Sequence, residues 1–140
     1  MEQRPQVIAI EEHYFDSEIL SHYGEGERRA GLRERLEDVG AKRIADMDRA
    51  GIDIQVLSHA APGTHRMDAD KAVPLARGAN DRLRDLVRPN PQRFAGFATL
   101  PASDPQAAAD ELERAVMKLD LKGAMVHGLT QGLFIDDKRF

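Results

Sequence analysis

Two side chains near the start of the chain have the types and the spacing of metal ligands. Glu11 and His13 stand two residues apart, directly after the apolar run Gln6–Ile10. Side chains two apart on a strand point to the same face, and a carboxylate beside an imidazole can hold a divalent metal such as zinc or manganese. Glu12 is expected on the opposite face. Glu-x-His is also an ordinary surface pair, so alone it does not establish a metal site.

Two more histidines follow apolar runs. His59 comes directly after Leu57-Ser58, and His127 follows Val126. An imidazole at the carboxyl end of a strand can contact a substrate or transfer a proton, because it titrates near neutral pH. We therefore predict His59 and His127 as substrate-binding residues, with a solvated loop histidine as the alternative for His59. His65 is expected at the surface, and His22 receives no role.

Other catalytic motifs are absent from the sequence. Residues 128–132 carry two glycines but lack the Gly-Lys-Ser/Thr ending of a phosphate-binding loop. No Gly-x-Gly-x-x-Gly or Gly-x-Ser-x-Gly is present, which disfavours dinucleotide binding and a serine hydrolase. We assign no catalytic residue to this chain.

Short apolar runs alternate with longer helix-favouring runs. Strands are predicted at residues 6–10, 51–58, 94–100 and 123–126. Helices are predicted at residues 34–50, 69–87 and 105–119, where apolar residues recur at about 3.6-residue spacing. Asp104 is expected to cap the last helix, and Leu112, Val116 and Leu119 to form its buried stripe. Residues 17–32 are expected to form a long loop.

The alternation of strands and helices indicates right-handed βαβ units and a parallel sheet. A doubly wound open sheet and a TIM barrel both meet that description. A complete barrel needs roughly 250 residues, and the chain has 140. We expect an α/β fold whose parallel βα units form the N-terminal half of a TIM barrel, with residues 1–140 as a single partial domain.

Composition restricts the partners. The net charge is -4, and the arginines are spread among acidic residues, which disfavours binding to nucleic acid or an anionic membrane. No apolar run approaches the ~18 residues of a membrane span. The absence of cysteine excludes disulfides and thiolate sites, and it fits a cytoplasmic protein.

Several longer stretches resemble one family, the amidohydrolase-2 family, in the same order along the chain. They are Ile10–His13, Leu57–Gly63, Ala76–Asp81, Asn90–Pro101 and Gly123–Phe140. The family includes metal-dependent decarboxylases of aromatic or unsaturated carboxylic acids. The resemblance implies a TIM barrel, a divalent metal cofactor (zinc or manganese) and a small-molecule carboxylic acid as substrate.

The resemblance also implies roles for particular residues. It makes Glu11 and His13 metal ligands, and it places His127 where the family's decarboxylases often have an asparagine. The family's further metal-binding His and Asp and its catalytic His come from later strands, beyond residue 140. We therefore expect the N-terminal part of a homo-oligomeric decarboxylase or hydrolase. The alternatives are a non-catalytic half-barrel that associates with itself or a partner chain, and an open sheet without a site.

Overall fold

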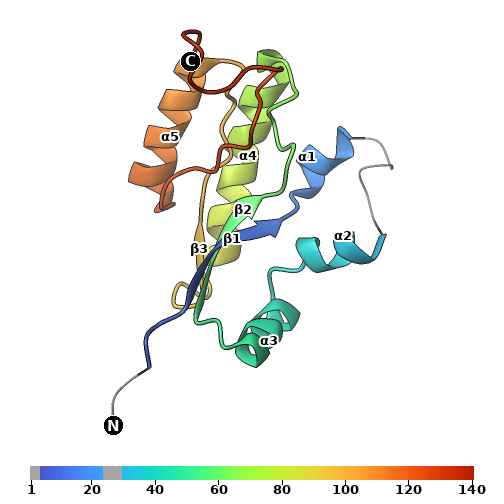
Figure 1. Ribbon diagram of the computed structural model, residues 1–140, viewed down its shortest axis with the longest axis vertical. Helices are drawn as coiled ribbons and strands as arrows, with labels where there is room; N and C mark the ends of the chain where they lie inside the picture. Colours follow the sequence, from blue (N-terminus) through green and yellow to red (C-terminus); the bar gives the residue numbers. More distant parts are fainter. Residues whose placement is uncertain (1–3, 24–29) are drawn as a thin grey trace.

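The chain folds around a parallel sheet flanked by helices, as Figure 1 shows. A computed structural model describes residues 4–23 and 30–140. In chain order the elements are β1 (Ile8–Tyr14), α1 (Ser17–Ser21), α2 (Ala30–Glu37), α3 (Ala41–Ala50), β2 (Ile54–His59), α4 (Ala69–Val87), β3 (Phe94–Gly96) and α5 (Pro105–Leu119). The strands lie in the order β1-β2-β3, and both pairs are parallel. The α/β fold built from parallel βα units is thus confirmed.

The predicted fourth strand is reduced to a parallel bridge. Ala124 bridges Ala98, and the N–H groups of Lys122 and Met125 donate to the carbonyls of β3 and of Ala98 at 2.8 and 3.0 Å. Residues 122–125 therefore lie beside the end of β3, in the position of a fourth strand. β3 itself ends earlier than predicted.

The main core lies between the sheet and helices α4 and α5. Leu57 of β2 and Phe94 of β3 pack there against Leu83 of α4 and Leu121, which follows α5. Gly96 makes this close approach possible, because a Cβ at that position would lie 2.8 Å from a methyl carbon of Leu121 and 3.0 Å from one of Leu83. In Figure 1, α4 and α5 stand side by side next to the strands.

The single helix predicted at residues 34–50 is wrong, because the chain breaks it into α2 and α3. Gly40 adopts a non-helical conformation with φ -123° and ψ -145°. The carboxylate of Asp38 accepts a hydrogen bond from the Gly40 N–H at 2.7 Å. This local bond competes with the helical ladder, as aspartate side chains commonly do.

The loop predicted at residues 17–32 is also partly wrong, and its residues 24–29 lie outside the described chain. Asp16 caps α1 by accepting hydrogen bonds from the N–H groups of Glu18 and Ile19, both at 3.1 Å. Arg82 of α4 donates to the same carboxylate at 2.7 and 2.8 Å. Burial raises the pKa of Asp16, but the hydrogen bonds from Arg82 and Ile19 hold it below its usual range. This pair fastens α1 to α4.

Helices α4 and α5 have the predicted bounds, and the predicted cap is confirmed. Asp104 accepts a hydrogen bond from the Ala107 N–H at 3.0 Å. The predicted stripe is wrong at Val116, which is 42% exposed, whereas Glu111 is 1% exposed. Glu111 is buried because α5 turns the Glu111 carboxylate toward α4. Asn80 of α4 donates a hydrogen bond to this carboxylate at 2.8 Å, and Arg114 donates two more at 2.7 and 2.8 Å. Among the described residues, no helix is long and apolar enough to cross a membrane.

Replacing Asn80 with alanine is expected to destabilise the fold. Asn80 is fully buried, donates to the Thr99 carbonyl at 3.0 Å, accepts from the Thr99 N–H at 2.9 Å and also binds Glu111. Asn80→Ala leaves these partners unpaired and should lower the free energy of unfolding by about 3 kcal/mol, measured by urea denaturation. Gln106→Ala, the control on exposed helix surface, should change it by less than about 0.5 kcal/mol. Equal losses in both variants would contradict this account.

Candidate functional site

The Glu11-Glu12-His13 segment lies inside β1, because the strand continues to Tyr14 instead of ending near Ile10. The pairing with β2 contains one extra β1 residue between Ala9 and Glu12. Such a bulge shifts the alternation of side chains and is common beside functional sites. The strand pairing is regular from Glu12 onward, which fixes the faces of the residues that follow.

Glu12 faces the helix layer, as predicted. Its carboxylate accepts a hydrogen bond from the Gln55 amide at 3.0 Å. Arg43 of α3 binds the same Gln55 through its side-chain oxygen at 3.4 Å. Because side chains alternate along the regular part of the strand, His13 belongs to the other face. Glu11 lies within the bulge, next to this regular part.

His13 is held in an orientation that suits a metal ligand. It pairs with Ser58 across the two strands, and its Nδ1 lies 3.0 Å from the Ser58 hydroxyl, which is fully buried. The tautomer in which Nδ1–H donates to this hydroxyl leaves a lone pair on Nε2. A hydrogen bond of this kind fixes the ring of many metal-binding histidines. Together with the exposed carboxylate of Glu11, the donor set fits a divalent cation.

The described residues do not form a complete metal site. Within residues 4–23 and 30–140, no three His, Asp or Glu side chains are placed to hold a metal ion together. A catalytic zinc site normally has three protein ligands and a water. A cavity of about 750 Å³ opens beside the motif, between β1 and helices α2 and α3.

His127 joins this end of the sheet from the segment after the fourth-strand position. Its ring lies 5.6 Å from the ring of His13. Its Nε2–H donates to the carbonyl of His59 at 2.8 Å. The fold therefore brings together His13, His127 and the backbone of His59, which come from three separate segments.

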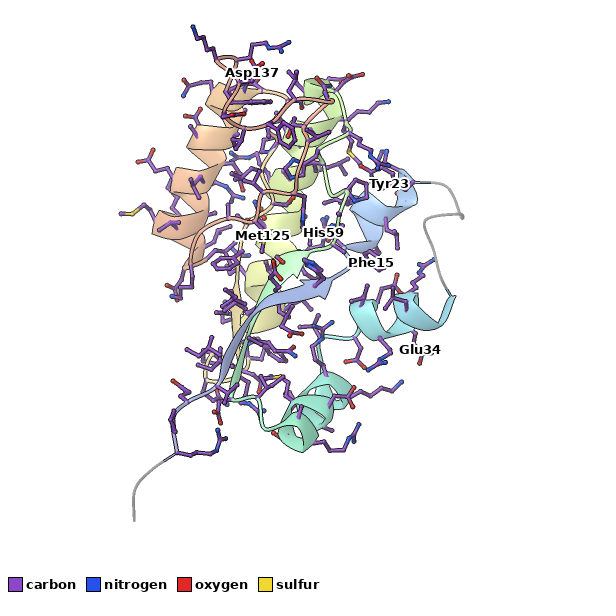
Figure 2. All side chains as sticks on the ribbon, viewed as in Figure 1. Phe15, Tyr23, Glu34, His59, Met125 and Asp137 are labelled. Carbon is purple, nitrogen blue, oxygen red and sulfur yellow. The ribbon has the colours of Figure 1, made fainter. Side chains whose placement is uncertain are left out.

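The ring of His59 lies elsewhere. It is 4% exposed and packs on Tyr14 and Phe15, with ring centroids 5.6 and 6.1 Å apart. Figure 2 shows His59 and Phe15 close together at the ends of β1 and β2. Since His59 pairs with Tyr14, its side chain shares the face of Tyr14 and not that of His13. Burial lowers the pKa of His59.

His65 was expected at the surface, and that expectation is wrong, because its ring is 1% exposed. It lies 5.7 Å from the ring of His127, at 81°, and its Nδ1 is 2.8 Å from the Thr130 hydroxyl. Burial, and next the proximity of His127, lower the pKa of His65 to about 4. The hydropathy pattern of the sequence around His65 does not indicate that its ring is buried. The turn that produces it has Gly63 at φ 54°, a conformation that favours glycine.

Comparison with known proteins identifies the family. The Amidohydrolase family model matches residues 12–140. Gamma-resorcylate decarboxylase of Polaromonas sp. is 41% identical over 128 residues, which are 89% of this chain and 39% of that protein. The structure of 5-carboxyvanillate decarboxylase from Sphingomonas paucimobilis matches with a TM-score of 0.90 and 34% identity, covering 96% of this chain and 46% of that one.

A second similar structure includes a metal. Dihydroxybenzoic acid decarboxylase from Polaromonas sp., with bound manganese and the inhibitor 2-nitroresorcinol, matches with a TM-score of 0.82 and 39% identity. The match covers 91% of this chain and 40% of that one. This chain belongs to the amidohydrolase family, and its parallel βα units are the N-terminal half of the family's barrel. It spans about two fifths of the length of the curated relatives, 39% and 40% of the first two.

The low pKa of His65 predicts a specific loss of stability in acid. Between the ordinary imidazole pKa of 6.5 and about 4, the unfolded chain binds a proton that folded His65 does not. The free energy of unfolding therefore falls as the pH drops through this window, by up to about 3 kcal/mol from this residue. Urea denaturation of the native chain and His65→Asn at pH 7 and pH 4 should show that the variant lacks this part of the loss. Parallel pH profiles would contradict the assignment.

Proposed function

We propose that this chain is the N-terminal part of a metal-dependent, non-oxidative decarboxylase that acts on an aromatic carboxylic acid. One observation carries the proposal: the fold sets His13, oriented by Ser58, next to His127 at the carboxyl end of a parallel sheet. Active sites of (β/α) barrels are built at that end. The family relationship supports the reaction class, because gamma-resorcylate and 5-carboxyvanillate decarboxylases are among the similar proteins. Hydrolysis of a related acid derivative is the second reaction that such a site supports.

Glu11 and Nε2 of His13 would hold a divalent metal, manganese or zinc. Manganese is the metal bound in the similar dihydroxybenzoic acid decarboxylase. A metal bound there would polarise an oxygen of the acid. Ser58 contributes by holding Nδ1 of His13, so that Nε2 stays free as a ligand. Because this chain offers two ligands, we expect weak binding with much of the coordination left to water or to further protein ligands.

His127 is the proposed substrate-binding residue, and His59, predicted in the same role, would support it indirectly because its ring lies on the other face of the sheet. The half-buried ring of His127 lies beside His13, and with Nε2 engaged by the His59 carbonyl its Nδ1 is left to contact a hydroxyl or carboxylate group of the acid. His59 would act through this carbonyl, which fixes how the His127 ring lies. We also propose a homo-oligomer in the cytoplasm, and the cysteine-free composition supports the location.

Manganese binding tests the metal site directly. Isothermal titration of the full chain with Mn²⁺ should detect weak binding that His13→Ala abolishes. Ser58→Ala should weaken it about 10- to 100-fold, as loss of a ligand-orienting hydrogen bond does. Ser21→Ala, whose exposed hydroxyl donates to the Glu18 carbonyl at 2.7 Å, is the matched control and should leave the affinity unchanged. Unchanged binding in both His13→Ala and Ser58→Ala would contradict the site.

A non-catalytic, self-associating half-barrel is the second candidate, and the edge of β1 favours it. In the described sheet β1 pairs only with β2, and Val7, Ile8 and Ile10 are 43, 50 and 58% exposed. An open apolar edge is a site of association. Size-exclusion chromatography with light scattering tests this candidate, and a clean monomer at micromolar concentration would refute it.

An activity assay can exclude the non-catalytic candidate. We expect the chain alone, with Mn²⁺ and 2,6-dihydroxybenzoate, to release no appreciable CO2, because no three possible ligands among the described residues are placed to hold a metal together. Robust decarboxylation that EDTA abolishes would show that this expectation is wrong and would exclude the non-catalytic candidate.

A further inference from the structure

We propose that His65 is a positioning residue that fixes the ring of His127 by clamping residues 127–131 against residues 60–68, the loop after β2. The importance of the clamp for catalysis rests on the proposed role of His127 toward substrate. The clamp itself is a property of the fold and can be tested without turnover.

His65 contacts residues 127–131 in three ways. Its ring meets the ring of His127 edge to face, with centroids 5.7 Å apart. Its Nδ1 lies within hydrogen-bond distance of the Thr130 hydroxyl, at 2.8 Å, and Thr130 is 4% exposed. Its backbone carbonyl accepts a hydrogen bond from the Gln131 N–H at 3.1 Å. A single residue thus holds both ends of the 127–131 segment.

The loop that carries His65 is itself firmly attached. The buried Thr64 hydroxyl donates to the Leu100 carbonyl at 2.9 Å, beyond the end of β3. The Tyr23 hydroxyl donates to the Gly63 carbonyl at 2.6 Å. The loop therefore reaches across the end of β3 and presents His65 to the segment on its far side. A fixed support of this kind is what a positioning residue requires.

The chemistry of His65 indicates a role beyond filling space. Its Nε2 is buried and has no hydrogen-bond partner among the described residues. An unpaired buried nitrogen costs stability, so an apolar ring would serve better if packing were the only requirement. What the imidazole adds over such a ring is its Nδ1, which binds Thr130. Through this bond, His65 holds Thr130 in the backbone segment that follows His127, while its ring contacts His127 itself.

The consequence for His127 is a fixed tautomer. Its Nε2–H donates to the His59 carbonyl on one side, while the His65 ring packs against it on another. Gly128 follows at once with φ 33°, a conformation that favours glycine. With the clamp in place, neutral His127 carries its proton on Nε2 and offers the Nδ1 lone pair.

Long-range ¹H–¹⁵N NMR of the histidine side chains in the full chain at pH 8 tests the clamp, because the two ring nitrogens report the tautomer. The native chain should show His127 with a protonated Nε2 and an unprotonated Nδ1. In His65→Ala the two ¹⁵N shifts of His127 should collapse toward the averaged values of free imidazole. His65→Asn should largely restore the native pattern, because its amide can occupy the position of Nδ1 and bind Thr130. Thr130→Val should reproduce part of the collapse without disturbing the core, and His22→Asn, on the exposed segment after α1, should change nothing.

The same samples distinguish the clamp from the proposed function. A native His127 pattern in folded His65→Ala and Thr130→Val would overturn the proposal. If the same variants also lost Mn²⁺ affinity as the His127 shifts changed, the proposal would be overturned as well. His65 would then support the whole site and would not act on His127 in particular. Failure of the native chain to bind Mn²⁺ would refute the proposed function, while the NMR pattern and its response to His65→Ala would still support the clamp.

Discussion

The regular pairing of β1 with β2 beyond the bulge is the constraint on which the site depends. It sets His13 opposite Ser58 and Tyr14 opposite His59. Because neighbouring pairs in a parallel sheet project to opposite faces, one face receives the candidate metal ligand with its orienting hydroxyl. The other face receives the rings of Tyr14 and His59, which pack together. A one-residue shift in the register of β1 on β2 would turn His13 to the opposite face of the sheet and separate it from His127.

The helix layer is connected to this end of the sheet by buried polar contacts. Asn80 of α4 holds both backbone groups of Thr99, and the next residue, Leu100, accepts the hydrogen bond from Thr64. From there the loop carries His65 to His127. The side chains of Asn80 and Thr64 are hydrogen-bonded inside the protein, where an unmade hydrogen bond is costly, so the arrangement is specific. A continuous set of contacts therefore connects α4 with His127, the proposed substrate-binding histidine.

The family relationship and the geometry both indicate that this chain contains part of a barrel. Glu11 and His13 are the proposed metal ligands, and no group of three possible ligands occurs among the described residues. The chain covers about two fifths of the length of its curated relatives, 39% of the first. The exposed apolar residues of β1 lie where a parallel barrel continues its sheet with a further strand. The open edge of β1 is what a sheet that forms half of a closed barrel leaves exposed.

The sequence by itself determined the βα order, the bounds of α4 and α5, and the importance of Glu11 and His13 as candidates. These features depend on local pattern: apolar spacing, a capping aspartate and side-chain alternation along a strand. Only the tertiary structure decided that β1 extends to Tyr14, that Val116 faces solvent while Glu111 is buried, and that His65 lies inside. Those outcomes depend on contacts between residues far apart in the chain, such as Asn80 with Glu111 and His65 with Thr130. A polar residue becomes a core residue when a distant partner satisfies it, and local spacing carries no information about that partner.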